Sequence, residues 1–270
     1  MIRSDYHIHS NFSSDARASM EDMIEKAINL DLQRICFTDH LDYDYPQIED
    51  GYNFMLNIDE YFKKINEVKE RYASKIEIYK GLELGLQPHI SKKLNELVEK
   101  YDLDFIIGST HVIDKLDPYY PDYWSKKKED EGIIQYFQSI IDSCKSFQGF
   151  HVYGHLDYIV RYIPNISKPY PYEQYADIID EVLKTIIDQG KGIEVNTSGY
   201  KYIFKHPHPR SEILQRYKEM GGEIITIGSD AHEPGYVGYS FNQASTLLQS
   251  LGYKYYTTFV KGKPQFHKFT

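Results

Sequence analysis

The chain has 270 residues, of which 41% are hydrophobic and 26% charged, and its formal net charge is −9 at pH 7. These proportions are typical of a globular protein that buries a full core. The acidic balance and the lack of a long basic run argue against duplex nucleic acid as a partner.

The cysteine usage and the first residues predict a cytoplasmic protein. The two cysteines, Cys36 and Cys144, are far apart and form no CxxC pair, which indicates reduced thiols. Residues 1–7 contain no apolar core of a signal peptide, and no run approaches the roughly 18–20 apolar residues of a membrane span. We therefore expect neither secretion nor membrane insertion.

Short apolar runs alternate with amphipathic segments along the whole chain. The runs are rich in Ile, Val, Tyr and Phe and lack regular polar alternation, which indicates strands buried on both faces of a parallel sheet. The predicted strands span residues 4–7, 34–38, 76–84, 105–109, 151–154, 192–196 and 224–228, with a last strand near 255–260.

Helical periodicity fills the segments between these strands. In residues 20–30 the apolar positions fall on one stripe, and Ser19 with Asp22 three residues later resembles an N-cap. The other predicted helices span residues 58–72, 90–101, 133–147, 172–189, 210–220 and 242–251. Repeated strand–helix units predict one domain over residues 1–270, folded as a (β/α) barrel or, failing that, as a doubly wound sheet.

Two connections that follow strands are long. Residues 41–57 and 113–130 are both rich in Tyr, Asp and Pro. Long loops after the strands of a compact domain commonly carry function, so we expect both near the functional site.

The chain contains eleven histidines, and most of them stand where a predicted strand ends. Residues at or near these strand ends are His7, His9, His40, Glu83, His111, His155, Asp230 and His232. In a parallel barrel the carboxyl ends of the strands converge on one mouth, so these side chains are expected to meet. Imidazole and carboxylate ligands together suit zinc, iron or manganese better than calcium or magnesium.

These motifs, taken in chain order, resemble those of the PHP (polymerase and histidinol phosphatase) superfamily, and the resemblance spans nearly the whole chain. It is closest to the monofunctional histidinol-phosphate phosphatases, because the chain lacks a polymerase module and contains the segments 108–111 (GSTH), 154–157 (GHLD) and 194–199 (EVNTSG). The resemblance implies a distorted (β/α)7 TIM-like barrel with a trinuclear divalent metal centre.

The resemblance also implies how the ligands are shared among three metal ions. The first ion takes His7, His9, Glu83 and Asp230; the second takes Glu83, His111 and His155; the third takes Asp15, His40 and His232. Asp15 departs from the family pattern, since many members carry histidine there. A carboxylate at this position remains able to bind a metal ion.

The implied activity is hydrolysis of a small phosphate monoester, L-histidinol phosphate, by a hydroxide that bridges metal ions, as a step of histidine biosynthesis. Asp230 or His232 would assist proton transfer. Arg17 and Arg161 would bind the phosphoryl group, since a guanidinium can grip phosphate with two hydrogen bonds. Asn196 and Ser198, at the end of the strand without a ligand, would contact the substrate or order the groups around it.

The imidazole of histidinol phosphate would need a flat apolar surface and a polar partner. Candidates for the surface in the two long loops are Tyr43, Tyr45, Tyr119, Tyr120 and Trp124, and candidates for the partner are Asp42 and Asp44. His206 and His208 form a second His-x-His between prolines and are interpreted as non-ligands. His89, His151 and His267 are interpreted as ordinary histidines.

Three other readings stay open at this point. A phosphoesterase acting on nucleotides or nucleic acid would need a basic groove, but the lysines at 126–128 are followed directly by the acidic residues 129–131. A non-catalytic metal-binding scaffold would be expected to have lost ligands. A metal-dependent amidohydrolase often uses a carbamylated lysine, and no lysine stands at a predicted strand end. The sequence leaves the metal identity and the oligomeric state undecided.

Overall fold

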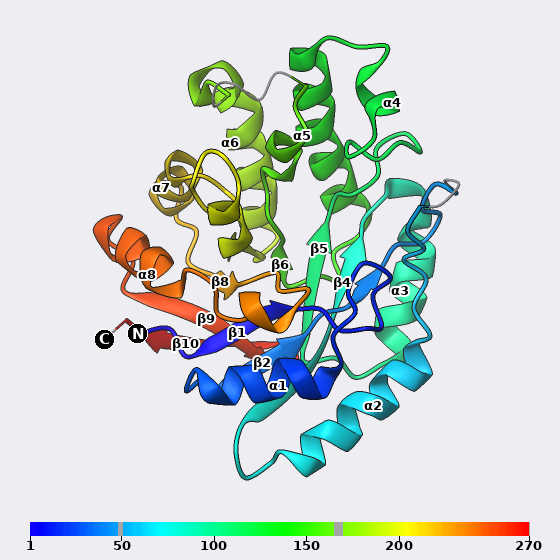
Figure 1. Cartoon of the computed structure of the whole chain (residues 1–270). Helices are drawn as coiled ribbons and strands as arrows, with labels where there is room; N and C mark the ends of the chain where they lie inside the picture. The colour runs from blue at the N-terminus through cyan, green and yellow to red at the C-terminus, as the bar shows by residue number, and fades with distance from the viewer. Residues whose placement is uncertain (48–50, 165–169, 270) are drawn as a thin grey trace.

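The computed structural model describes residues 1–47, 51–164 and 170–269. A strongly curved parallel sheet stands at its centre, and helices surround it (Figure 1). The strands of this sheet are β1 (Ser4–Ile8), β2 (Arg34–Phe37), β3 (His40–Leu41), β4 (Glu77–Gly85), β5 (Phe105–Ser109), β6 (Val152–Tyr153), β7 (Gly192–Asn196) and β8 (Ile225–Gly228). Their order is β1-β2-β4-β5-β6-β7-β8, and the short β3 pairs with β4 beyond the end of β2.

The seam between β1 and β8 closes the barrel at its carboxyl end. Ile8 forms a parallel bridge with Ala231, the His9 N–H donates to the Ala231 carbonyl over 2.9 Å, and the Asp230 N–H donates to the His7 carbonyl over 2.9 Å. The predicted distorted barrel is confirmed. Closure at this end brings the residues that follow β8 next to those that follow β1.

Helices cover the outside of the sheet. They are α1 (Met20–Asn29), α2 (Ile58–Arg71), α3 (Ser91–Lys100), α4 (Pro121–Trp124), α5 (Glu129–Ser146), α6 (Tyr172–Asp188), α7 (Ser211–Glu219) and α8 (Phe241–Ser250), with 3-10 turns η1 (Pro88–Ile90), η2 (Tyr158–Arg161), η3 (Thr197–Lys201) and η4 (Pro234–Tyr236). The predicted cap of α1 is present as a capping box, in which the Ser19 side chain accepts from the Asp22 N–H. None of the helices in the described part of the chain has the length and apolarity of a membrane span.

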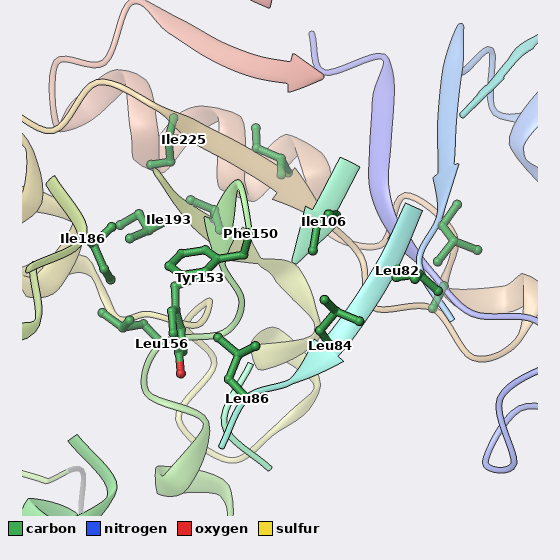
Figure 2. Packing of buried hydrophobic residues seen from close by; sticks show 14 of the residues in the cluster. Leu82, Leu84, Leu86, Ile106, Phe150, Tyr153, Leu156, Ile186, Ile193 and Ile225 are labelled. Atoms are coloured by element: carbon green, nitrogen blue, oxygen red, sulfur yellow. The ribbon is translucent and has the colours of Figure 1, made fainter. Parts of the chain in front are cut away.

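Alternate residues of each strand face different environments. Figure 2 shows Leu82, Leu84 and Leu86, of and after β4, in one buried hydrophobic cluster with Phe150 and Leu156. The intervening residues face the barrel interior, where Gly81 leaves room for its neighbours: a Cβ there would lie 2.8 Å from Cys36 Sγ.

An antiparallel hairpin forms the floor of the barrel. It consists of β9 (Tyr255–Val260) and β10 (Lys263–Lys268), which pair with each other in a sheet of their own. Phe259 of β9 stacks on Phe105 with ring centroids 5.2 Å apart, and its carbonyl accepts from the Tyr6 hydroxyl over 3.0 Å. The predicted strand near residues 255–260 exists, whereas β10 was not predicted because most of its side chains are exposed and follow no apolar pattern.

Candidate metal centre

The carboxylate of Glu83, fully buried on β4, is the centre of the candidate site. Imidazole nitrogens surround it: His155 Nε2 at 2.8 Å, His40 Nδ1 at 3.0 Å, His7 Nε2 at 3.1 Å, His111 Nε2 at 3.3 Å and His9 Nε2 at 3.5 Å. His7 and His9 lie in and directly after β1, His40 begins β3, and His111 and His155 follow β5 and β6, so only the barrel brings the four segments together. Convergence at the carboxyl ends of the strands occurs as the sequence predicted.

Asp230 adds a second carboxylate beside the first pair of histidines. Its Oδ1 lies 3.4 Å from His9 Nε2 and 3.7 Å from His7 Nε2. Asp230 has a φ of 53°, and His155 has a φ of 22°, a left-handed conformation that costs energy for residues other than glycine. The backbone thus holds two of the predicted ligands in strained conformations that aim their side chains at the centre.

Asp15, His40 and His232 form the outer part of the cluster. Asp15 Oδ2 lies 3.1 Å from His232 Nε2 and 3.5 Å from His40 Nε2. Burial raises the pKa of Asp15, but His40 and His232 lower that pKa by more, to well below its ordinary value. The aspartate that departs from the family pattern therefore stands among the histidines as an ionised carboxylate.

The cluster has the chemistry of a site built for cations. Burial raises the pKa of Glu83, but His7, His40 and His111 lower that pKa by more, so the carboxylate stays ionised. Within the described part of the chain, several buried nitrogen and oxygen atoms of the cluster have no partner in hydrogen-bonding geometry, namely His9 Nε2, Asp15 Oδ1, His40 Nδ1 and His155 Nδ1. Unpaired buried polar atoms cost roughly 1–3 kcal/mol each, and a bound cation would satisfy atoms of this kind.

The donor atoms are spaced as ligands of a metal ion require. Among the described residues of this cluster, three groups have donors within 4.8 Å of one another: His7, His9 and Asp230; His40, Glu83 and His111; His9, His40 and His232. Nitrogen and carboxylate oxygen donors together fit zinc, iron or manganese. The residues present fit the divalent metal centre that the sequence predicted.

Outer groups fix the orientation of these imidazoles. The Nδ1 atoms of three rings lie 2.6 Å from Glu194 Oε1 for His7, 2.8 Å from Asp42 Oδ1 for His111, and 3.2 Å from Ser13 Oγ for His9. Because a carboxylate accepts the Nδ1–H of His7 and of His111, Nε2 is the nitrogen that each ring turns toward the centre, where a metal ion would take its lone pair in place of a proton.

Glu194 and Ser13 were not predicted as site residues, and Asp42, a candidate partner of the substrate, lies against His111. Asp42 is committed to His111 through its Oδ1 and is 1% exposed. Glu194 had a signal in the sequence: it stands two residues before Asn196 on a strand, and residues two apart share a face. Gly228 leaves room for the His7 side chain, since a Cβ at position 228 would lie 2.3 Å from His7 Cβ.

Arg161, Asn196 and Ser198 gather around the outer oxygen of Asp230. Arg161 donates to Ser198 Oγ over 2.7 Å, and its Nη2 lies 3.6 Å from Asp230 Oδ2. Ser198 Oγ and Asn196 Nδ2 lie 3.2 Å and 3.3 Å from the same oxygen. By contrast, Arg17 is exposed and is absent from the residues that line the cavity described next.

A cavity of about 240 Å³ opens above the centre. Its lining comprises the candidate ligands Asp15, His40, His111, His155, Asp230 and His232; the aromatic residues Tyr45, Tyr52, Phe54, Tyr119, Tyr158, Tyr162 and Tyr202; and Asp117, Arg161, Ser198 and Lys201. Both long loops contribute to this wall. Tyr43, Tyr120, Trp124 and Asp44 do not line the cavity, and Asp44 is bound to Lys93 and His89 at the surface.

Asp117 is the carboxylate of the aromatic wall, and sequence reasoning missed it. It is 6% exposed, accepts from the Tyr45 hydroxyl over 2.5 Å and accepts from the Tyr119 N–H over 2.7 Å. Burial raises its pKa. It lies inside a long loop without periodicity, so no local pattern marked it.

The remaining histidines lie away from Glu83 in the described part of the chain. His208 Nδ1 contacts Asp157 Oδ1 at 2.6 Å, and His206 Nδ1 contacts the Pro207 carbonyl at 2.8 Å. His151 stacks on Phe259 at the floor of the barrel.

Comparison with known proteins supports the resemblance to the PHP superfamily that the sequence motifs indicate. The PHP domain family model matches residues 5–198. The chain is 32% identical over 263 residues to "Histidinol-phosphatase" of Lactococcus lactis, covering 96% of this chain and 95% of that protein. It is 31% identical over 252 residues to "Probable histidinol-phosphatase" of Clostridium acetobutylicum, covering 93% and 94%.

A solved structure with the same fold adds ligands to the comparison. It is the histidinol phosphate phosphatase of Lactococcus lactis complexed with zinc, L-histidinol and phosphate, which superposes with a TM-score of 0.90 at 31% identity. The match covers 97% of this chain and 98% of that one.

Proposed function

Because the chain belongs to the PHP domain family, we propose that it is a metal-dependent phosphatase that hydrolyses L-histidinol phosphate to L-histidinol and inorganic phosphate. One observation carries the proposal: imidazoles from several strands converge on Glu83 directly beneath a cavity with an aromatic and acidic wall. The related phosphatase solved with zinc, L-histidinol and phosphate supports it. The reaction would belong to histidine biosynthesis in the cytoplasm.

The family resemblance assigns the residues that would hold three divalent ions, and the grouping of these side chains around Glu83 supports the assignment. His7, His9, Glu83 and Asp230 would bind the first; Glu83, His111 and His155 the second; Asp15, His40 and His232 the third. When bound, divalent ions at such a site bind phosphoryl oxygens, lower the pKa of a bound water and stabilise charge on the leaving oxygen. Zinc is supported by the related structure, and the donor set also suits manganese and iron.

The chain's own cations would hold the phosphoryl group. Arg161 is 6% exposed along its side chain and presents its guanidinium to the cavity beside Ser198. A buried guanidinium forms strong, oriented hydrogen bonds with phosphate oxygens. Asn196 would keep Asp230 in place, and Asp230 or His232 would transfer the proton. Arg17 keeps the phosphate role that the family resemblance implies, from an exposed position beyond Asp15.

The opposite wall fits the leaving alcohol. Histidinol carries an ammonium group and a flat imidazole, and the wall offers the buried carboxylate of Asp117 between Tyr45 and Tyr119. A carboxylate pairs with an ammonium, and aromatic faces pack against a flat ring. Asp117→Asn is expected to raise KM for L-histidinol phosphate about tenfold. KM for p-nitrophenyl phosphate, which has no ammonium, should stay within about twofold, and an equal rise for both esters would contradict this role.

The alternative of a nucleic-acid phosphoesterase is not favoured. The cavity contains Arg161 and Lys201, but Asp15, Asp117 and Asp230 line the same small space. A strand of nucleic acid needs a basic groove rather than an acidic pocket.

The deciding experiment is phosphate release from L-histidinol phosphate, p-nitrophenyl phosphate and a set of nucleotides, with manganese or zinc added and then chelated. We expect a kcat/KM for L-histidinol phosphate above about 10⁴ M⁻¹s⁻¹, lost on chelation. Activity confined to nucleotides would retain the metal site and reject the substrate. Bound metal without hydrolysis of any ester would instead support the hypothesis of a non-catalytic metal-binding scaffold.

A further inference from the structure

A second histidine–carboxylate pair lies behind the phosphate side of the cavity. His208 and Asp157 are 2% and 0% exposed, and His208 Nδ1 lies 2.6 Å from Asp157 Oδ1. The other carboxylate oxygen, Oδ2, accepts from the Arg210 N–H over 3.1 Å and from the Tyr170 hydroxyl over 3.3 Å. The pair is thus fully inside the protein and tied to two neighbouring segments.

The pair consists of an ionised aspartate and a neutral histidine. Burial is the main cause that lowers the pKa of His208 to about 4, while Asp157 acts in the opposite direction. Burial raises the pKa of Asp157, but His208 lowers that pKa by more. The carboxylate can only accept, so the His208 Nδ1–H donates to it and the ring orientation is set.

Asp157, one member of this pair, is connected to Arg161 through the turn η2. Asp157 immediately precedes η2, whose last residue is Arg161, and the Asp157 carbonyl accepts from the Val160 N–H over 3.1 Å. A short turn of this kind has little stability of its own. The hydrogen bonds to the Asp157 side chain therefore help to fix where the turn, and the arginine at its end, can lie.

His208, the other member of the pair, contacts the segment that contains Ser198. The backbones of His208 and Asn196 exchange two hydrogen bonds of 2.7 and 2.9 Å. The His208 ring packs on η3, since a Cβ at Gly199 would lie 2.9 Å from its Cδ2. Ser198, in the same turn, accepts from Arg161 over 2.7 Å.

Tyr202 makes a third link. Its ring centroid lies 6.2 Å from that of His208, and the Arg161 Cζ lies 4.8 Å from the Tyr202 ring. A guanidinium over a tyrosine face is held by the negative potential of the ring. His208 thus contacts the residue before η2, the turn η3 and the Tyr202 ring, and each of these bears on the Arg161 side chain.

We propose that His208 is a positioning residue for Arg161: with Asp157 on one side and η3 on the other, it holds the guanidinium against Ser198 and so sets the affinity for the phosphoryl group. The inference rests on the proposed function only in that Arg161 binds phosphate. It assigns a role to the second His-x-His motif, which the metal centre does not use.

The test measures binding of inorganic phosphate to the metal-loaded enzyme by calorimetry in matched variants. His208→Leu removes the donor to Asp157 and is expected to weaken phosphate binding about tenfold. His208→Asn keeps an N–H donor near the position of Nδ1, so its affinity should stay within about threefold of the wild type. His206→Asn, in the same loop, is the control and should bind phosphate as the wild type does.

A double-mutant cycle separates positioning from general damage. Arg161→Met alone should weaken phosphate binding, and adding His208→Leu to it should change affinity by less than about twofold. An equal further loss in that background, or no effect of either single variant, would overturn the proposal. So would loss of a metal equivalent from His208→Leu, because the donors of Asp157, His206 and His208 lie within 4.8 Å of one another and would then hold an ion.

The outcome is independent of the leaving group. If the wild type fails to hydrolyse L-histidinol phosphate while the phosphate-binding cycle behaves as expected, the substrate assignment fails and the positioning role stands. If hydrolysis is efficient and the effects of His208→Leu and Arg161→Met on phosphate affinity are additive, the positioning role of His208 is refuted and the substrate assignment stands.

Discussion

The two ends of the barrel interior differ in kind, although the same strands build both. At the amino end, Tyr6, Cys36 and Phe105 pack with Phe259 in an apolar floor. At the carboxyl end, the same β5 strand presents Ser109, which donates to Glu83 over 2.8 Å. Phe105 in the apolar floor and Ser109 beside the candidate metal centre are four residues apart on β5, which corresponds to about 13 Å.

Two histidines, His151, which is half-buried, and His111, which is buried, make the difference concrete. At the floor, His151 stacks against both Phe105 and Phe259, and burial lowers its pKa to about 4. At the mouth, burial also lowers the pKa of His111, but Asp42 and Glu83 raise that pKa by more, to about 10. Burial by itself does not mark a functional histidine. Burial together with several carboxylates at contact distance does, because carboxylates are the partners that a metal site also needs.

The largest expected effect is at the mouth. Glu83→Gln removes the charge that all the surrounding imidazoles face, so the metal ions it would share lose a common ligand. We expect kcat/KM to fall about a thousandfold or more, together with fewer bound metal equivalents. Metal analysis by mass spectrometry and the phosphate-release assay measure both. A variant with full metal content and near-normal activity would refute the central role of Glu83.

A substitution at the floor of the barrel should lower the free energy of unfolding and leave kcat/KM nearly unchanged. Phe259→Ala removes the ring that stacks on Phe105 and His151, which should cost about 3–5 kcal/mol of unfolding free energy. Denaturant unfolding of the metal-free protein measures this loss. At temperatures where the variant is folded, kcat/KM should stay within about threefold of the wild type. A loss of activity as large as that of Glu83→Gln would show that the two ends are not separable.

A smaller effect is expected one contact away from the metal centre. Glu194→Gln weakens the acceptor of the His7 Nδ1–H, so metal affinity should fall about 10–100-fold while the fold remains. Competition with a chelator of known affinity measures the change. Asp44→Asn, at the surface, provides the matched control and should leave metal affinity unchanged.

The smallest effect concerns the pH dependence of stability at the floor. His151 has a pKa of about 4 in the fold, against about 6.5 when unfolded, so the unfolded state takes up the proton first as pH falls. Its contribution is therefore fully present above pH 6.5 and is lost on acidification toward pH 4. Between pH 7 and 5 the wild type should lose roughly 2 kcal/mol more than His151→Asn. Parallel unfolding curves for the two proteins across this range would contradict the assignment.

The sequence predicted the barrel because its signals are local. Runs such as residues 105–109 read as buried strands and the stripe of residues 20–30 as a helix, and β5 and α1 lie there. The placement of His111 and His155 directly after strands sufficed to bring them to one mouth, since parallel strands all end on the same side. The ligand roles themselves stay predictions until metal is measured.

What escaped prediction depends on contacts between segments distant in the chain. Asp117 lies in a loop without periodicity and becomes a cavity residue only because it folds against Tyr45, 72 positions away. Arg17 and Arg161 are equal candidates by type and loop position, yet the structure exposes one and buries the other.

By itself, therefore, the sequence determined the repeated strand–helix pattern, the strand-end positions of the imidazoles and carboxylates, and the family. The tertiary structure alone decided which outer groups orient the imidazoles, which carboxylate faces the cavity and how β9 and β10 form the floor. The physical reason is that periodicity and turn signals act within a few residues. Pairing of buried polar groups such as His7 with Glu194 is set by barrel closure, which joins segments 187 positions apart.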